Sequence, residues 1–407
     1  MRLQVLMLML SATCWATVRY DDFRVYRVLP KNVHQLQALR KLEGEYELWN
    51  EPGLLHKNVD VMVAPYQRTA FEEFLQRLNF HKHVMVENVQ ELIDNERKGV
   101  GASSTNFDWE NYYSIDEINN WLVSLKDKFP NVVQVIVGGE SFEGRQLLGV
   151  KISFKPGNRA VFLEGGIHAR EWIAPATVTF IINELLTNAD PSMREVIESR
   201  DWYVFPSVNP DGYEYSRHTD RMWRKTTTVY ERCNGADANR NWDYHWMDGG
   251  ASTDPCSEVH GGSKAFSEKE TSTLSQFITT VVQDLDAYIS FHSYSQLLLI
   301  PFGHQGMEVP ENNDQLHDIG IKAMNKLAER YGTEYTVGNK PNVLGYIGSG
   351  GSIDWMCGVH KIKMPYTFEL RDTGRYGFIL PPDQIIPTGL ETFDGLIEII
   401  RLYDASQ

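Results

Sequence analysis

Hydrophobic and polar positions follow two different patterns along the chain. From residue 17 to residue 98, alternating runs and helix-spaced runs follow one another in the order strand, helix, strand, strand, helix, strand. The predicted strands span residues 23–28, 46–49, 59–64 and 83–89, and the predicted helices span 33–45 and 67–78. This βαββαβ order is typical of a small α+β open sandwich.

The remainder of the chain carries continuous apolar runs between helical patterns. The apolar runs are 132–139, 160–166, 201–210, 286–295 and 362–370, and the helical patterns are 172–187, 272–285, 316–331 and 390–403. Strands that are apolar on both faces predict an α/β fold with a mixed, mostly parallel twisted sheet flanked by helices. Function in such folds gathers at the carboxyl ends of the strands.

The first sixteen residues have the pattern of a secretory signal peptide. Arg2 precedes an apolar run from Leu3 to Leu10, and the segment ends on small residues at Ala16. The run is too short to span a bilayer, and no later segment approaches eighteen apolar residues, so we expect no membrane partner. A buried N-terminal helix is the alternative. We expect the mature protein to be secreted and extracellular.

A seam between two domains is predicted in the segment LIDNERKGVGASSTN, residues 92–106. Helix-forming residues give way there to Gly, Ser, Thr and Asn directly after the basic pair Arg97-Lys98. An exposed polar segment with a basic pair suits a trypsin-like protease, although a plain interdomain linker has the same composition. We therefore divide the chain into a signal (1–16), a small domain (17–98) and a large domain (99–407).

Charge and cysteine content narrow the function further. The 407-residue chain has a formal net charge of −15, which argues against a nucleic-acid partner because phosphate binding needs a basic surface. Of four cysteines, Cys14 lies in the predicted signal. Cys233 and Cys256 bracket 22 residues and form the natural disulfide pair in an oxidising compartment. Cys357 then remains as a buried free thiol.

Candidate metal ligands occur at two predicted strand ends. In FLEGGIHAREW, His168 and Glu171 follow a strand and a Gly-Gly turn, and side chains three residues apart at such a bend can converge on one point. In DAYISFHSYS, the period of two places Ser290, His292 and Tyr294 on one polar face. A zinc site is one interpretation. A hydrogen-bonded core histidine is the alternative for His292.

Two further groups of charged residues are candidates for functional roles. Glu369 lies in an apolar strand, where a carboxylate costs several kcal/mol unless it is compensated. It is either an ion-pair partner of Arg371 or another arginine, or a general base. Arg224 precedes the proposed disulfide loop, and Asn239 and Arg240 lie inside it. An arginine fork beside an amide suits a carboxylate, although most such loops are merely solvated.

At this point the chain resembles the pancreatic-type zinc metallocarboxypeptidases of the A/B group, which are made as secreted zymogens. Seven blocks in the family's order carry the resemblance: HAREW, SVNPDGYEYS, WRKT, DANRNWD, SFHSYSQLLL, SGGSIDW and FELRDTGRYGF. It covers nearly everything after residue 16. It implies one Zn²⁺ per chain, peptide and protein substrates, and activation by a trypsin-like protease. We expect a monomer.

The resemblance also implies roles for individual residues. The zinc ligands would be His168, Glu171 and His292. Glu369 would be the general base that activates a water, and Asp237 would orient His168. Arg224 would polarise the scissile carbonyl and stabilise negative charge on its oxygen.

Substrate contacts follow from the same resemblance. Asn239, Arg240 and Tyr346 would hold the free terminal carboxylate of the substrate. Arg170 and Tyr294 would line neighbouring subsites. The small domain would be the activation segment, which packs over the cleft and is removed near Arg97-Lys98.

The resemblance implies an A-type preference, for aromatic or aliphatic terminal residues. The position after SGGS is Ile353, where an acidic residue would accompany basic C-terminal residues, and Gly303 and Thr367 fit the same interpretation. Pro341 and Gly345 depart from the family's bulkier residues, which leaves the pocket width open. The alternatives are a B-type preference for basic residues, a non-catalytic secreted binding homologue and a structural zinc protein.

Overall fold

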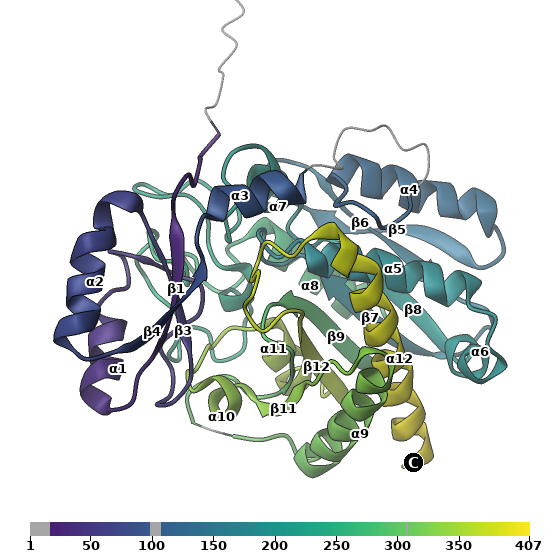
Figure 1. Ribbon diagram of the computed structural model, residues 1–407. Helices are drawn as coiled ribbons and strands as arrows, with labels where there is room; N and C mark the ends of the chain where they lie inside the picture. Colours follow the sequence, from purple (N-terminus) through teal and green to yellow (C-terminus); the bar gives the residue numbers. More distant parts are fainter. Residues whose placement is uncertain (1–16, 98–106, 307) are drawn as a thin grey trace, which may run out of the picture.

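A computed structural model describes residues 17–97, 107–306 and 308–407. Figure 1 shows two units side by side: the N-terminal unit, in purple and blue, and a larger unit that holds the rest of the chain. The predicted signal, residues 1–16, and the part of the predicted cleavage segment that starts at Lys98 lie outside the described residues.

The N-terminal unit is a four-stranded antiparallel sheet with helices, in the strand order β2-β3-β1-β4. Its elements are β1 (Arg24–Leu29), α1 (Val33–Arg40), β2 (Glu47–Leu48), β3 (Val59–Val63), a 3₁₀ turn η1 (Pro65–Gln67), α2 (Arg68–Arg77), β4 (His81–Val86) and α3 (Val89–Glu96). The predicted strand-helix order is present within this unit. A hydrophobic cluster that includes Tyr26, Val61 and Phe71 fills the space between sheet and helices.

Two boundaries in this unit differ from the sequence prediction. The helix expected over 33–45 ends at Arg40, and the strand expected over 83–89 ends at Val86. The helix α3 was not predicted; Asn88 caps it by accepting a hydrogen bond from Gln90 N. The cap side chain satisfies one of the free amide groups of this eight-residue helix, which overlaps the expected strand only at Val89.

The large unit contains an eight-stranded mixed sheet in the order β11-β10-β12-β9-β7-β8-β6-β5. Its central pairs β12-β9, β9-β7 and β7-β8 are parallel, which confirms the predicted mixed, mostly parallel fold. The strands are β5 (Val133–Glu140), β6 (Gln146–Ile152), β7 (Arg159–Gly165), β8 (Arg200–Phe205), β9 (Leu285–Ser293), β10 (Leu297–Ile300), β11 (Thr336–Asn339) and β12 (Met364–Leu370).

Helices cover both faces of this sheet. They are α4 (Ile115–Lys128), α5 (Ile173–Thr187), α6 (Pro191–Glu198), α7 (Pro210–His218), η2 (Ala238–Arg240), α8 (Lys269–Val281), α9 (Asn313–Tyr331), α10 (Lys340–Leu344), α11 (Ser352–Gly358), η3 (Pro382–Gln384) and α12 (Ile385–Ala405). Val161 and Leu163 of β7 point into one core cluster with α5, α9 and α12. Phe162 points into the other cluster, with α8 and α11, so β7 is buried on both faces.

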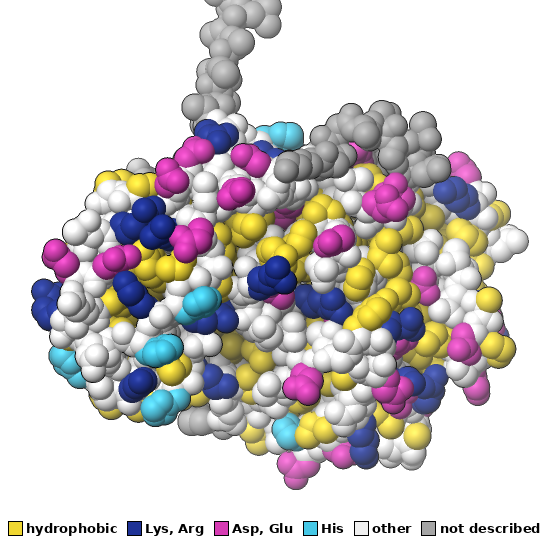
Figure 2. Space-filling model, viewed as in Figure 1, with side chains coloured by type: hydrophobic (Ala, Val, Ile, Leu, Met, Phe, Trp, Pro, Cys, Tyr) yellow, Lys and Arg dark blue, Asp and Glu magenta, His cyan; other side chains and the backbone are white. Residues whose placement is uncertain are grey.

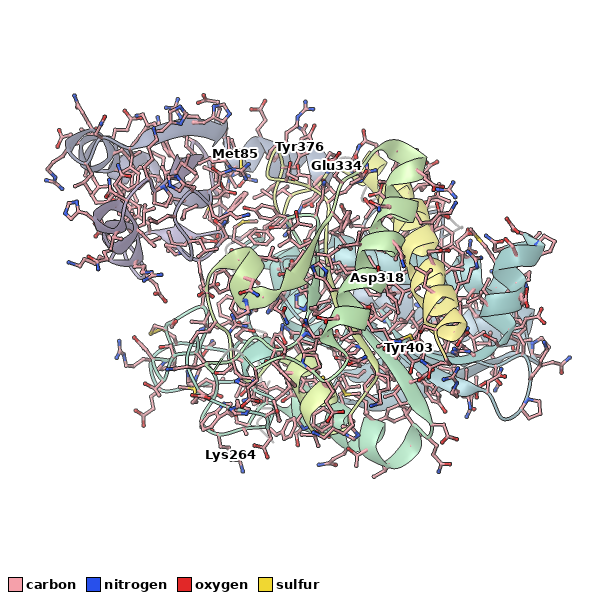
Figure 3. The ribbon with its side chains drawn as sticks, turned by 90° about the horizontal axis from the view of Figure 1, so that it is seen from below. Met85, Lys264, Asp318, Glu334, Tyr376 and Tyr403 are labelled. Carbon is pink, nitrogen blue, oxygen red and sulfur yellow. A yellow bond between two sulfur atoms is a disulfide. The ribbon has the colours of Figure 1, made fainter. Side chains whose placement is uncertain are left out.

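The two units meet through charged and apolar contacts. Glu96 at the end of α3 accepts two hydrogen bonds from Arg221, at 2.7 and 2.8 Å, and both side chains are 1% exposed. Trp49 packs with Tyr294 and Phe378 in one cluster, and Met85 lies against the same cluster. Figure 3 shows Met85 on the side of the N-terminal unit that faces Tyr376. These contacts hold the N-terminal unit beside the carboxyl ends of β7 and β9.

The outer surface is mixed in charge. Figure 2 shows acidic and basic side chains interspersed over the visible face of both units. Among the described helices, the structure contains none with the length and apolar character needed to cross a membrane.

Candidate active site

Three metal-ligating side chains come together where two parallel strands end. β7 ends at Gly165, and the next residue, Gly166, has φ +66° in a turn where a Cβ would lie 2.9 Å from Pro175 Cγ. His168 and Glu171 follow this turn and precede α5, while His292 lies in β9, next to β7. Because parallel strands end at the same edge, the turn after β7 and the end of β9 meet.

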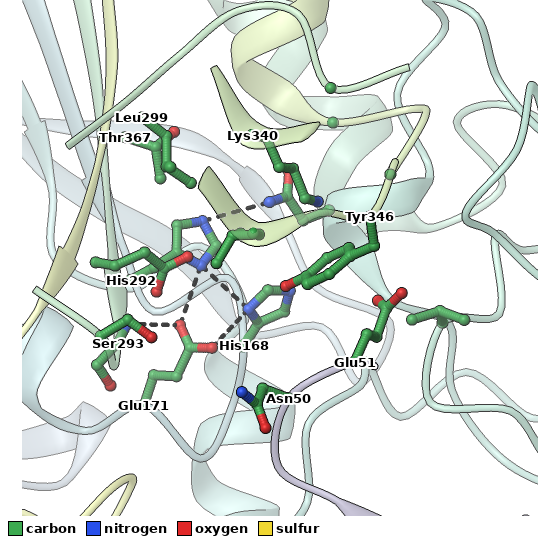
Figure 4. Close-up of a pocket in the computed structure, with 18 of the residues that line it drawn as sticks. Asn50, Glu51, His168, Glu171, His292, Ser293, Leu299, Lys340, Tyr346 and Thr367 are labelled. Carbon is green, nitrogen blue, oxygen red and sulfur yellow. Dashed lines mark hydrogen bonds and ion pairs between the residues drawn. The ribbon is translucent and has the colours of Figure 1, made fainter. Parts of the chain in front are cut away.

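The three side chains are buried and their donor atoms converge. His168 Nδ1 lies 2.8 Å from Glu171 Oε1, and His292 Nδ1 lies 3.1 Å from both His168 Nδ1 and Glu171 Oε2. The exposed fractions of the three residues are 4%, 3% and 2%. Figure 4 shows the two imidazoles and the carboxylate facing one another across this point.

The hydrogen bonds around His168 favour a cation among these atoms. Its Nε2 donates to Asp237 Oδ1 at 3.0 Å, because that buried carboxylate can only accept while ionised. Burial lowers the pKa of His168, which favours a neutral ring; with Nε2 donating to Asp237, Nδ1 then presents a lone pair toward the oxygen of Glu171. Two lone pairs at 2.8 Å repel each other unless a cation lies between them.

The donor set fits zinc. Two imidazole nitrogens and one carboxylate oxygen are the protein ligands of a catalytic zinc site with an open fourth position. Tetrahedral ligands at about 2.1 Å from zinc lie about 3.4 Å apart, close to the spacing of the atoms here. The three residues form a group able to hold a metal ion, which confirms the zinc prediction.

Asp237 and Arg224 form a layer behind the metal ligands. Arg224 Nη2 donates to Asp237 Oδ2 at 2.7 Å, and its Nη1 lies 3.9 Å from Glu171 Oε1. Burial alone would raise the pKa of Asp237, but Arg224 and His168 hold that pKa well below its usual range. The carboxylate is thus available as the permanent acceptor that fixes the tautomer of His168.

Glu369 lies beside His292 on the neighbouring strand. β12 and β9 are parallel with Glu369 in register with His292, so both side chains point into the same cleft. Burial raises the pKa of Glu369 to about 7, with His292 opposing the shift. Arg371 Nε donates a hydrogen bond to Glu391 Oε1 at 2.7 Å. Arg371 is therefore paired with Glu391 and does not neutralise Glu369.

The loop with Asn239 and Arg240 borders the other side of the cleft. A disulfide joins Cys233 to Cys256, and the free Cys357 is buried. Arg240 is held by its own backbone surroundings, because Nε donates to Gly250 O at 2.8 Å and Nη1 to Asn239 O at 3.0 Å. Its Nη2 faces the cleft.

The N-terminal unit reaches into this cleft. Glu51 Oε1 lies 3.4 Å from Arg240 Nη2, and Glu47 Oε1 accepts a hydrogen bond from Arg170 Nη1 at 3.1 Å. The hydroxyl of Tyr294 donates to Asp60 Oδ2 at 2.7 Å. Arg170 and Tyr294, two predicted subsite residues, are therefore engaged by the N-terminal unit in this form of the protein.

One pocket brings together the metal ligands, Glu369, Arg224 and Arg240. Its remaining wall includes Tyr346, Ile353, Leu299, Gly303, Thr367 and Lys340. Figure 4 shows Lys340, Tyr346 and Glu51 beside His168 and His292 in this pocket. Sequence reasoning missed Lys340 and Glu51 as members of the site. The only signal for Lys340 was its place next to Pro341, one of the unusual positions of the pocket.

Comparisons with known proteins agree with this geometry. The family model for "Zinc carboxypeptidase" matches residues 118–395, and that for "Carboxypeptidase activation peptide" matches residues 26–96. The chain is 43% identical to "Zinc carboxypeptidase A 1" of Anopheles gambiae over 98% of this chain and 93% of the relative.

Two further relatives bear on fold and specificity. "Carboxypeptidase B" of Astacus astacus is 43% identical over 71% of this chain and 96% of its own length. The crystal structure of thrombin activatable fibrinolysis inhibitor superposes with a TM-score of 0.87 at 31% identity, covering 94% of this chain and 98% of the other. Relatives with A-type names and relatives with B-type names thus reach the same sequence identity to this chain. With its buried His168-Glu171-His292 site and both family models matched, the chain belongs to the zinc carboxypeptidases that are made with an activation peptide.

Proposed function

We propose that the chain is a secreted zymogen whose activated form removes the last residue of peptides and proteins, with a preference for aromatic and aliphatic residues. A signal of residues 1–16 would direct secretion. The activation domain would comprise residues 17–98 and the enzyme residues 99–407. The single observation that carries the proposal is the convergence of the zinc ligands with Glu369 and the Arg240 guanidinium in one pocket.

Recognition of a free chain end rests on Arg240. Its guanidinium is 2% exposed and points one Nη into the cleft, with Asn239 and Tyr346 beside it. A terminal carboxylate satisfies this cation with charge-assisted hydrogen bonds. An internal peptide bond brings no carboxylate and would leave the buried guanidinium unpaired, which disfavours mid-chain cleavage.

The chemistry of the peptide bond falls to Glu369 and Arg224. When bound, zinc would polarise the scissile carbonyl and lower the pKa of a water. Glu369 accepts the proton of that water, and a carboxyl pKa of about 7 suits both taking this proton and passing it to the leaving amine. Arg224 donates hydrogen bonds to the carbonyl oxygen as negative charge develops on it. Asp237 holds both Arg224 and His168 in place.

The apolar preference rests on the wall around the departing side chain. Ile353 and Leu299 line the pocket, and Gly303 and Thr367 leave space beside them. An apolar side chain buried there gains roughly 25 cal/mol per Å² of surface removed from water. None of these four residues offers a negative charge to a C-terminal lysine or arginine.

Activation would require cleavage by a trypsin-like protease near Arg97-Lys98. Until then, the segment that carries Glu47 and Glu51 lies across the substrate groups Arg170 and Arg240. N-terminal sequencing after limited trypsin treatment checks the position of the cut; a stable core that begins far from Gly99 contradicts it.

The function is tested on peptides that differ only in the last residue. The trypsin-activated protein is incubated with each peptide, and the freed amino acid is identified. We expect release of Phe, Leu and similar residues, and loss of activity with 1,10-phenanthroline while the fold persists. Release of Lys and Arg ahead of Leu supports the B-type alternative, and a folded, activated protein that releases nothing supports the binding homologue.

A further inference from the structure

A lysine occupies the wall of the pocket for the departing side chain. Lys340 is the first residue of α10 and lines the same pocket as Ile353, Leu299 and Thr367. The side chain is half-buried, and its ammonium lies 5.3 Å from the centre of the Tyr346 ring. Beside the apolar and small residues Ile353, Leu299 and Gly303, the pocket wall therefore carries a cation.

Two glycines make room for this lysine. A Cβ at Gly303 would lie 3.2 Å from Lys340 Cδ, and a Cβ at Gly348 would lie 2.3 Å from Lys340 Nζ. The same Cβ at Gly348 would lie 3.0 Å from the guanidinium carbon of Arg240. The ammonium of Lys340 and the guanidinium of Arg240 therefore flank one point in the pocket.

The ammonium lacks a protein partner. Within residues 17–97, 107–306 and 308–407, the Lys340 ammonium donates no hydrogen bond, and no carboxylate lies within 4.0 Å of its nitrogen; its neighbours are the Tyr346 ring and the more distant charges of Arg240, Glu51 and Asp354. Burying a charge without a partner is costly, and the neighbouring Arg240 adds repulsion. A lysine in this position is thus poised to bind an anion that enters the pocket.

We propose that Lys340 is a specificity-determining residue: it lets the pocket accept a C-terminal residue with a carboxylate side chain, glutamate or aspartate, and makes it reject lysine and arginine. This inference rests on the proposed carboxypeptidase function and names a further class of substrate for it. Apolar residues still enter, because Ile353 and Leu299 offer apolar contacts and the stem of the lysine is aliphatic. The pocket then serves two kinds of terminal residue.

The charges that face Lys340 support an acidic guest. Glu51 of the activation segment already places a carboxylate in the pocket, 3.4 Å from Arg240 and within the field of Lys340. Removal of that segment takes Glu51 away and leaves the two cations facing solvent. Asp354 also lines this pocket, but it is 2% exposed and its Oδ2 accepts a hydrogen bond from Gly303 N at 2.8 Å.

The lysine also keeps its charge at neutral pH. Burial, together with the adjacent Arg240, lowers the pKa of Lys340 to about 8, while Glu51 and Asp354 oppose the shift. Below that pKa the amine is protonated, so the ammonium is the main form at pH 7.

Terminal glutamate and glutamine give the sharpest comparison, because they have the same shape and differ in charge. Trypsin-activated enzyme is assayed at pH 7 on peptides ending in Glu, Gln, Leu and Lys. We expect kcat/KM for the Glu peptide to exceed that for the Gln peptide by about tenfold, with the Lys peptide the poorest substrate. In Lys340→Met, we expect the Glu-to-Gln ratio to fall by about 10- to 100-fold.

Matched variants separate this role from its alternatives. Lys340→Arg keeps the charge and should keep the Glu-to-Gln ratio above one, whereas Lys326→Met, which removes a surface lysine paired with Glu329, should leave every rate as it is. If Lys340→Met lowers kcat/KM by the same factor for every peptide, the lysine binds the terminal carboxylate of the substrate and not its side chain. The inference is then overturned. A wild-type Glu-to-Gln ratio below one overturns it as well, even when Leu is released. If no peptide loses its last residue, the proposed function falls with it.

Discussion

The zinc ligands and the proposed pocket for the departing side chain lie in one cleft, yet their side chains are held in different ways. His168 and His292 are fixed by β7 and β9 and by contacts with Glu171 and Asp237, all of them buried. The pocket wall includes Lys340, on the five-residue helix α10. The ammonium of this lysine hydrogen bonds to none of the described residues.

This difference separates chemistry from selectivity. The metal centre is built on the segment that follows β7 and on the adjacent strand β9, so a change in any one ligand disturbs several neighbours at once. The wall of the pocket includes a short segment outside the sheet, where a substitution such as a lysine leaves the metal centre intact.

The largest effect is expected on the metal side. His168→Ala removes one of three protein ligands and leaves Asp237 without its imidazole partner. We expect loss of bound zinc and a fall in kcat/KM by at least about 10⁴-fold, measured by metal analysis and peptide hydrolysis on the same preparation. Circular dichroism serves as the control for folding. Retained zinc together with retained turnover would falsify the assigned metal centre.

A smaller effect is expected from the pocket side. Arg240→Gln removes the cation proposed to bind the terminal carboxylate but touches no metal ligand. We expect kcat/KM to fall by about 10²- to 10³-fold with zinc content unchanged. Measuring kcat/KM and zinc content on the same variant tests whether the pocket and the metal centre are independent. Loss of zinc in Arg240→Gln would mean that the two are coupled. Lys322→Met, which removes a surface lysine paired with Asp318, serves as the control.

The smallest effect is expected at Cys357, which reports on the rigidity of the pocket wall. This thiol lies on α11, the helix that also carries Ile353, and it is 6% exposed. Burial raises the pKa of the Cys357 thiol to about 12, so at pH 8 the thiol stays protonated and labelling should rise only as the pH approaches that value. We expect negligible alkylation by iodoacetamide in the native protein and full alkylation in denaturant. Rapid native labelling would show that this wall opens.

The fold was predictable where the apolar pattern was long and regular. The run 286–295 became β9, and the helical pattern 316–331 lies within α9, because each buries a continuous apolar surface. Short elements were less predictable. The helix α3 depends on its Asn88 cap and on packing against the large unit, through the ion pair of Glu96 with Arg221. Neither contact has a periodic signature.

The site divides in a similar way. The matched blocks contain every residue that we assign to the metal centre. The sequence analysis did not place Lys340 and Glu51 in the pocket, because only their position in the fold brings them there. In the sequence, one is a lysine beside a proline and the other is one acidic residue among 54. Only the packing of α10 and of the N-terminal unit brings them to Arg240.

The sequence by itself indicated the two-unit organisation and the α/β class, because hydrophobic period is a local property of the chain. It indicated the zinc ligands only through the resemblance of its motif blocks to a known family. The tertiary structure alone decided which charges share the pocket. Electrostatic interaction depends on distance and burial rather than on separation in sequence. Arg240, Lys340 and Glu51 therefore became one group only when the folded chain brought together residues up to 289 positions apart.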